Sequence, residues 1–116
     1  MTGAYSQAIK ASCQELLFCT GQTSRHPETG EILHKGDVEA QARQALENLK
    51  AIIEAAGGSL RDVARVGIYY RNKEDMNRVA KIRQEYFPED PPASTGIQVD
   101  LVDDDLLIEI DAIVAL

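Results

Sequence analysis

The sequence predicts an α+β protein in which a single mixed β-sheet carries two helices on one face. The chain has 116 residues, 44% of them hydrophobic, which suits one domain spanning residues 1–116. Two stretches repeat apolar residues at helical spacing, and several short runs are β-rich or alternate apolar with polar residues. The resulting order is β-β-α-β-α-β-β, and two helices can cover one face of one sheet.

The first two predicted strands are residues 4–10 and 15–20, whose short polar separation suits a hairpin. A turn-rich segment follows at residues 24–36. Within it, Pro27 and Gly30 favour a tight turn that begins near His26.

The first helix is predicted over residues 38–56. Asp37 can cap its N-terminus, and one continuous apolar stripe at helical period follows. Gly57 and Gly58 supply the left-handed stop that a β-carbon would penalise.

A third strand, residues 63–70, leads to the second predicted helix. Asn72 and Asp75 resemble a capping box for this helix, and Pro88 ends it. Its predicted inner stripe is Met76, Val79, Ala80, Arg83 and Tyr86.

The last two strands are predicted from alternation. Ile97, Val99 and Leu101 alternate with polar residues, as a half-buried strand should. Residues 106–116 have one wholly apolar face, and Leu107 and Ile113 are apolar residues on the other. No third helix is available to cover that second face, so we expect a symmetric oligomer in which sheets pack together.

Charge and composition exclude several classes of function. Nineteen acidic residues against twelve basic ones give a net charge of −7, which argues against nucleic acid as the main partner. No apolar run approaches the roughly 20 residues needed to cross a bilayer, so we expect a cytoplasmic protein that does not enter membranes. The histidines lack metal-ligand spacing, and no phosphate or dinucleotide loop is present, so neither a metal site nor a nucleotide-binding site is expected.

Two carboxylates are candidates for chemistry. Glu109 and Asp111 lie two residues apart on one strand face, with their side chains starting about 7 Å apart. On an exposed strand they would be polar surface. In a partly dry cleft a carboxylate has a raised pKa and can act as general acid or base, and oligomer packing should cover this face.

Several segments together carry a resemblance to a known family. These are Gly3-Ala4-Tyr5-Ser6-Gln7-Ala8, Thr20-Gly21-Gln22, residues 37–50 and Leu107-Ile108-Glu109-Ile110-Asp111-Ala112-Ile113. In combination they resemble the Rid family of reactive intermediate deaminases, also called YjgF-like proteins. The resemblance implies a fold like that of the small chorismate mutases, and a homotrimer with a central barrel of sheets and a small-molecule ligand in clefts between subunits.

The resemblance also implies a chemistry, the hydrolysis of reactive enamines and imines without a metal or organic cofactor. Asp111 stands where the family has a Glu that positions the attacking water, while Tyr5 and Thr20 match two further catalytic positions. Ser94 replaces the Arg that clamps the substrate carboxylate, and Gly96 stands where a Cys is common. Gly21, in the matched Thr20-Gly21-Gln22 segment, is a further implied substrate-binding residue. We also predict Arg25 and Glu109 as substrate-binding residues, with Arg25 as the candidate for a relocated cation and a solvated loop arginine as the alternative.

Three hypotheses follow. The first is a hydrolytic deaminase for a small enamine or imine other than the usual 2-imino acids, because Ser94 cannot form the charged fork of an Arg. The second is a non-catalytic trimer that binds a small metabolite or acts as a protein-interaction, holdase-like module. The third, a ribonuclease or translation inhibitor, is disfavoured by the net charge of −7.

Overall fold

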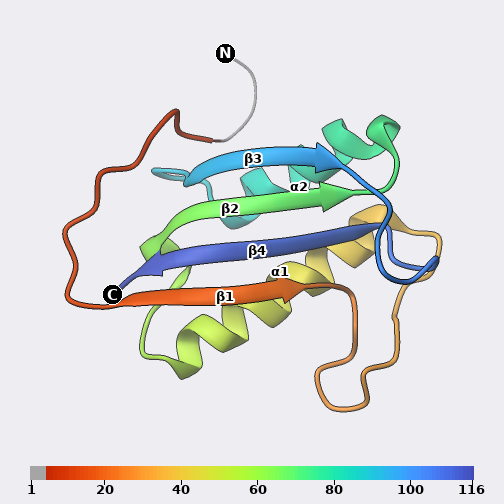
Figure 1. Ribbon diagram of the computed structural model, residues 1–116, viewed down its shortest axis with the longest axis horizontal. Helices are drawn as coiled ribbons and strands as arrows, with labels where there is room; N and C mark the ends of the chain where they lie inside the picture. The colour runs from red at the N-terminus through yellow and green to blue at the C-terminus, as the bar shows by residue number, and fades with distance from the viewer. Residues whose placement is uncertain (1–4) are drawn as a thin grey trace.

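A four-stranded mixed sheet forms one layer of the computed structural model, and two helices form the other; residues 5–116 are described (Figure 1). The α-helices and strands are β1 (Leu16–Gln22), α1 (Val38–Ala55), β2 (Val63–Tyr70), α2 (Met76–Tyr86), β3 (Ala93–Gln98) and β4 (Ile108–Ala115). The strand order is β1-β4-β2-β3, in which only the β2 and β3 pair is parallel. Both helices lie behind the sheet in Figure 1, which confirms the predicted α+β class.

Helix α1 forms where the apolar stripe predicted it. The Asp37 side chain accepts a hydrogen bond from the Ala40 backbone N–H at 3.1 Å, so it satisfies one of the free donors of the first turn. Gly57, at φ +90°, follows the C-cap residue and takes the left-handed conformation that favours glycine.

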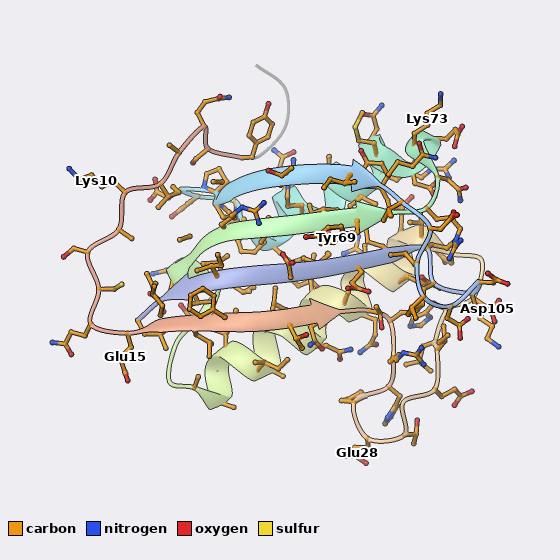
Figure 2. All side chains as sticks on the ribbon, in the orientation of Figure 1. Lys10, Glu15, Glu28, Tyr69, Lys73 and Asp105 are labelled. Atoms are coloured by element: carbon orange, nitrogen blue, oxygen red, sulfur yellow. The ribbon has the colours of Figure 1, made fainter. Side chains whose placement is uncertain are left out.

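The core lies between α1, α2 and the helix-facing side of the sheet. Strand β4 alternates strictly between buried and half-buried residues, as predicted for the final strand. Its apolar face packs with Val66 and Ile68 of β2 and Leu49 of α1. We call the opposite side of the sheet the outer face; Tyr69 points from it toward the viewer in Figure 2.

The predicted first strand is wrong. Residues 5–15 run past the ends of the strands, from the β3 edge of the sheet to the β1 edge (Figure 1). At one end the Ser6 N–H donates to the Pro92 carbonyl at 3.0 Å, and at the other the Gln14 N–H donates to the Leu116 carbonyl at 2.9 Å. The segment cannot form a hairpin with β1, because one end bonds just before β3 and the other just after β4, on different parts of the sheet. Ala4 lies outside the described residues.

The predicted capping box of the second helix is also wrong. The chain enters α2 through a short 3-10 turn, η2 (Lys73–Asp75), and neither Asn72 nor Asp75 makes a side-chain cap. The Asn72 carbonyl accepts from the Asp75 N–H at 3.0 Å, so the backbone closes this turn without the side chains. Ile82, absent from the predicted stripe, is fully buried, whereas Met76 is 52% exposed.

Strand β3 begins earlier than predicted. It spans Ala93–Gln98 and pairs with β2 from Arg65 opposite Ala93 to Tyr70 opposite Gln98. Ile97 of β3 is 47% exposed, and Val99, just after β3, is 41% exposed, because β3 is an edge strand. Small residues such as Ser94 and Gly96 give a weak strand pattern, whereas residues 97–101 alternate clearly between apolar and polar. The sequence therefore predicts a strand that begins too late.

No helix within residues 5–116 is long and apolar enough to cross a lipid bilayer.

Truncating Leu49 to Ala should lower the free energy of unfolding by about 2–5 kcal/mol, because this side chain is fully buried between α1 and the sheet. Urea unfolding monitored by circular dichroism, at one fixed protein concentration, measures the loss. Ile52→Ala on the exposed side of the same helix is the control and should cost less than about 1 kcal/mol. Equal losses in the two variants would contradict this account of the core.

Candidate functional site

Three hollows contain most of the polar residues predicted to be functional. The α2 cavity, of about 440 Å³, lies between α2 and the β2–β3 side of the sheet. The α1 cavity, of about 690 Å³, lies beside α1 and the end of β1. The outer-face cavity has a volume of about 350 Å³. Tyr5, Ser94 and Gly96 line the first. Gly21, Arg25 and Glu109 line the second, and Glu109 with Asp111 lines the third.

The α2 cavity contains a guanidinium group that the site prediction did not include. Arg83 reaches from α2 toward β3, where its Nη1 donates to Ser94 Oγ at 3.1 Å. Its Cζ lies 5.6 Å from the centre of the Tyr5 ring, a cation–π distance. Tyr5 is held there because the adjacent Ser6 bonds through its N–H and its hydroxyl to the Pro92 and Pro91 carbonyls.

The Arg83 charge has no counter-ion within the described part of the chain. Its Nε is buried and lacks a hydrogen-bond partner, and none of the ion pairs in residues 5–116 involves it. Burial lowers the pKa of Arg83 because removal from water disfavours the charged form. The α2 cavity is therefore a partly dry site with an unpaired positive charge.

Asp111 lies on the outer face with its carboxylate held by two donors. The Gly67 N–H donates to Oδ1 at 2.9 Å, and the Tyr69 hydroxyl donates to Oδ2 at 3.0 Å. A β-carbon at position 67 would collide with Oδ1, so glycine at this position lets the carboxylate approach the β2 backbone. The hydrogen bond to Asp111 raises the pKa of Tyr69, so the phenol stays protonated as the donor. Arg65 adds a distant cation, with Nη1 4.0 Å from Oδ1.

Glu109 borders both the α1 cavity and the outer-face cavity. It lies so close to Gly21 that a β-carbon at position 21 would collide with its carboxylate. Glycine at position 21 therefore lets the carboxylate approach the β1 backbone where β1 and β4 lose regular register.

Arg25 does not lie beside Ser94. It lines the α1 cavity, where its Nη1 donates to the Gly30 carbonyl at 3.0 Å and its Nη2 lies 4.0 Å from Asp103. Arg83 occupies the neighbourhood of Ser94 instead, so within one chain Arg25 is not the cation that faces this serine.

A single chain does not bring the predicted catalytic residues together. Tyr5 contacts Arg83 on the helix side of the sheet, whereas Asp111 lies on the outer face. Thr20 is exposed on β1 and lines none of the three cavities.

Arg83 could have been found from the sequence. It falls in the predicted inner stripe of the second helix, among apolar residues. A charged side chain on the buried side of a helix needs a partner or a function. Its proximity to Ser94 was not predictable, because it depends on how α2 packs over β3.

Residues 5–116 contain no cluster of three or more His, Cys, Asp or Glu side chains that could hold a metal ion. The protein atoms that can do chemistry here are instead the carboxylates of Asp111 and Glu109, the hydroxyls of Tyr5 and Ser94, and the Arg83 guanidinium.

The sheet with two helices on one face defines a small α+β protein. The family model described as Endoribonuclease L-PSP matches residues 1–116. The chain belongs to this family, which includes the RutC and Rid proteins, as the resemblance implied.

Three similar proteins illustrate the family. "RutC family protein PH0854" of Pyrococcus horikoshii is 49% identical over 111 residues, which are 96% of this chain and 86% of that protein. The "3-aminoacrylate deaminase RutC" of Acinetobacter baylyi is 43% identical over 86 residues, 74% of this chain and 68% of that protein. The solved structure of the Rid family protein YyfB from Yersinia pestis superposes with a TM-score of 0.85 at 33% identity, covering 97% of this chain and 87% of that one.

Proposed function

We propose that the protein hydrolyses a small reactive enamine or imine in clefts between the subunits of a homotrimer. The observation that carries this proposal is the Asp111 carboxylate, fixed in orientation by Gly67 and Tyr69 beside the outer-face cavity. A carboxylate has about four acceptor sites, and two donors leave room for a water. The relation to a 3-aminoacrylate deaminase supports the same class of reaction.

The chemistry needs one positioned water and one group that moves protons. An enamine first takes a proton from solvent on its carbon and becomes an iminium ion. Asp111 accepts a proton from water as the oxygen adds to the iminium carbon, which forms a neutral carbinolamine. The same carboxyl group then returns that proton to nitrogen. The C–N bond breaks, ammonia leaves, and the hydroxyl proton is released to solvent as the carbonyl forms, which offsets the proton taken up in the first step.

Assembly into a trimer would bring together the predicted site residues that a single chain holds apart. Asp111 and Glu109 lie on the outer face of one chain, while Tyr5, Ser94 and Gly96 line the α2 cavity. Packing the outer face of one subunit beside the β3 edge of the next would bring these two groups into one cleft. Phe18 and Leu16, 69% and 55% exposed on β1, supply apolar area for such packing.

The substrate is expected to differ from the usual 2-imino acids, because Ser94 cannot offer the bidentate contact that an Arg on β3 would make. The relative's substrate, 3-aminoacrylate, places its carboxylate one carbon further from the carbon that bears nitrogen. We therefore propose a 3-amino-2-enoate of similar size as the substrate class.

The purified protein should accelerate ammonia release from 3-aminoacrylate generated in situ by at least tenfold over buffer. It should have less than a tenth of that effect on 2-iminobutanoate generated by a threonine dehydratase, because the guanidinium beside Ser94 comes from Arg83 on α2 and not from β3, and so meets a carboxylate from a different direction. Rates of ammonia and 2-ketobutyrate formation provide the measurement. Heat-denatured protein is the control, and equal acceleration of both substrates would contradict the assigned preference.

One observation favours a second candidate, a trimer that binds a metabolite or a protein without catalysis. Asp111 already has two hydrogen bonds within its own chain and an Arg65 guanidinium 4.0 Å away, so it can serve to brace β2 against β4. Ligand binding without any turnover in the assay above would select this alternative.

A further inference from the structure

Arg83 has an environment that a purely structural arginine would not need. Its guanidinium is half-buried, it pairs with no carboxylate in residues 5–116, and it borders a cavity of about 440 Å³. A desolvated cation without a counter-ion costs free energy, which an anion in the adjacent cavity would offset.

Ser94 makes the guanidinium part of a two-residue anion site. Because Ser94 Oγ accepts a hydrogen bond from Arg83 Nη1, its own hydroxyl hydrogen is free to donate elsewhere. Arg83 has further N–H donors beyond the one that Ser94 uses, and the Tyr5 ring limits access of water on another side. Donors from α2 and β3 thus converge on the same hollow.

The size and lining of the α2 cavity select the kind of anion. Ile68, Val79 and Ala80 contribute apolar surface next to the two donors. A small organic acid presents an apolar carbon end and a carboxylate end, which matches this division of the walls. A polyphosphate would leave several charges without donors.

We propose that Arg83 and Ser94 bind the carboxylate of the substrate in the α2 cavity. The positive charge is then supplied from helix α2 and not from strand β3, where Ser94 stands. This inference rests on the proposed function for the identity of the anion as a substrate group, but anion binding itself can be measured without turnover.

The test uses propionate and its neutral isostere propionamide as probes, titrated into ¹⁵N-labelled protein and followed by amide chemical shifts. Propionate should shift amides around the α2 cavity and bind at least tenfold more tightly than propionamide, because only the acid carries the charge. Arg83→Gln should weaken propionate binding at least tenfold, and Arg83→Lys should retain part of it.

The matched control is Arg61→Gln, which removes the same charge from an exposed residue of η1 (Leu60–Asp62) outside the α2 cavity. It should bind propionate as the unaltered protein does. Circular dichroism and the dispersion of the spectra establish that each variant is folded, and Arg83→Lys preserves the charge should Arg83→Gln fail to fold.

The outcomes separate this inference from the proposed function. Propionate binding that depends on Arg83, with no turnover of any enamine, supports the anion site and removes the proposed reaction. Equal binding of propionate and propionamide overturns the anion site. Turnover that survives Arg83→Gln unchanged shows that this site does not bind the substrate carboxylate and overturns the inference while leaving the proposed reaction in place. The anion site is also overturned if millimolar propionate, in 50-fold molar excess over the protein, produces no shift of the amide signals.

Discussion

Replacing Asp111 by Asn is expected to reduce turnover of the enamine substrate by about 100-fold or more, the typical contribution of a positioned general base. The amide keeps the shape of the carboxylate. Its oxygen can still accept from the Gly67 N–H, and its nitrogen can donate to Tyr69 once the phenol rotates. The loss would therefore report the missing charge and proton acceptor, and not a disrupted sheet. Steady-state ammonia release measures it.

Two further variants make this prediction specific. Asp104→Asn, in the exposed loop before β4, makes the same chemical change away from the cavities and should leave turnover unchanged. Tyr69→Phe removes one of the two donors that orient Asp111 and should lower kcat more than it alters KM. Unchanged turnover in a folded, correctly assembled Asp111→Asn protein would remove Asp111 from the mechanism and favour the binding trimer.

Converting Ile113 to Lys is expected to abolish assembly and, with it, turnover. Ile113 is half-buried in the single chain, on the outer face of β4 between Phe18 of β1 and Arg65 of β2. A charge there would lie at the centre of the packed sheets of a trimer, where its desolvation is costly. Light scattering should give three times the 12.7 kDa chain mass for the unaltered protein and one chain mass for the variant.

Ile52→Lys is the matched control, because it places the same charge on the partly exposed side of α1. This variant should retain the mass of the assembly. An unaltered protein that is monomeric at micromolar concentration would contradict the proposed trimer. A monomer that retains turnover would show that one chain holds the complete site.

Helix α1 and strand β4 were largely predictable, because the spacing of apolar residues along each element indicates which of its sides is buried. The stripe of α1 and its Asp37 cap were readable at helical period, and Gly57 follows the helix end with positive φ. The strict alternation of β4 identified both its core face and the pair Glu109 and Asp111. These signals need only neighbours in the sequence.

Residues 5–15 and strand β3 were not predicted correctly, because their hydrogen-bond partners are remote in the sequence. Residues 5–15 have the apolar content of a strand, yet their hydrogen bonds go to Pro92, just before the edge strand β3, and to Leu116, just after the interior strand β4. The parallel pairing of β3 with β2 is likewise set by packing across α2, and its small residues carry little pattern.

The sequence by itself determined the α+β class, the two helices, the alternating final strand and the resemblance to the Rid family. Only the tertiary structure decided which functional groups meet. Arg83 and Ser94 come from a helix and a strand, and their 3.1 Å contact depends on the position of α2 above the sheet. Tyr69 reaches Asp111 through the register of β2 with β4. Periodicity specifies the face on which a side chain lies, whereas partners across elements depend on long-range packing, which no local pattern encodes.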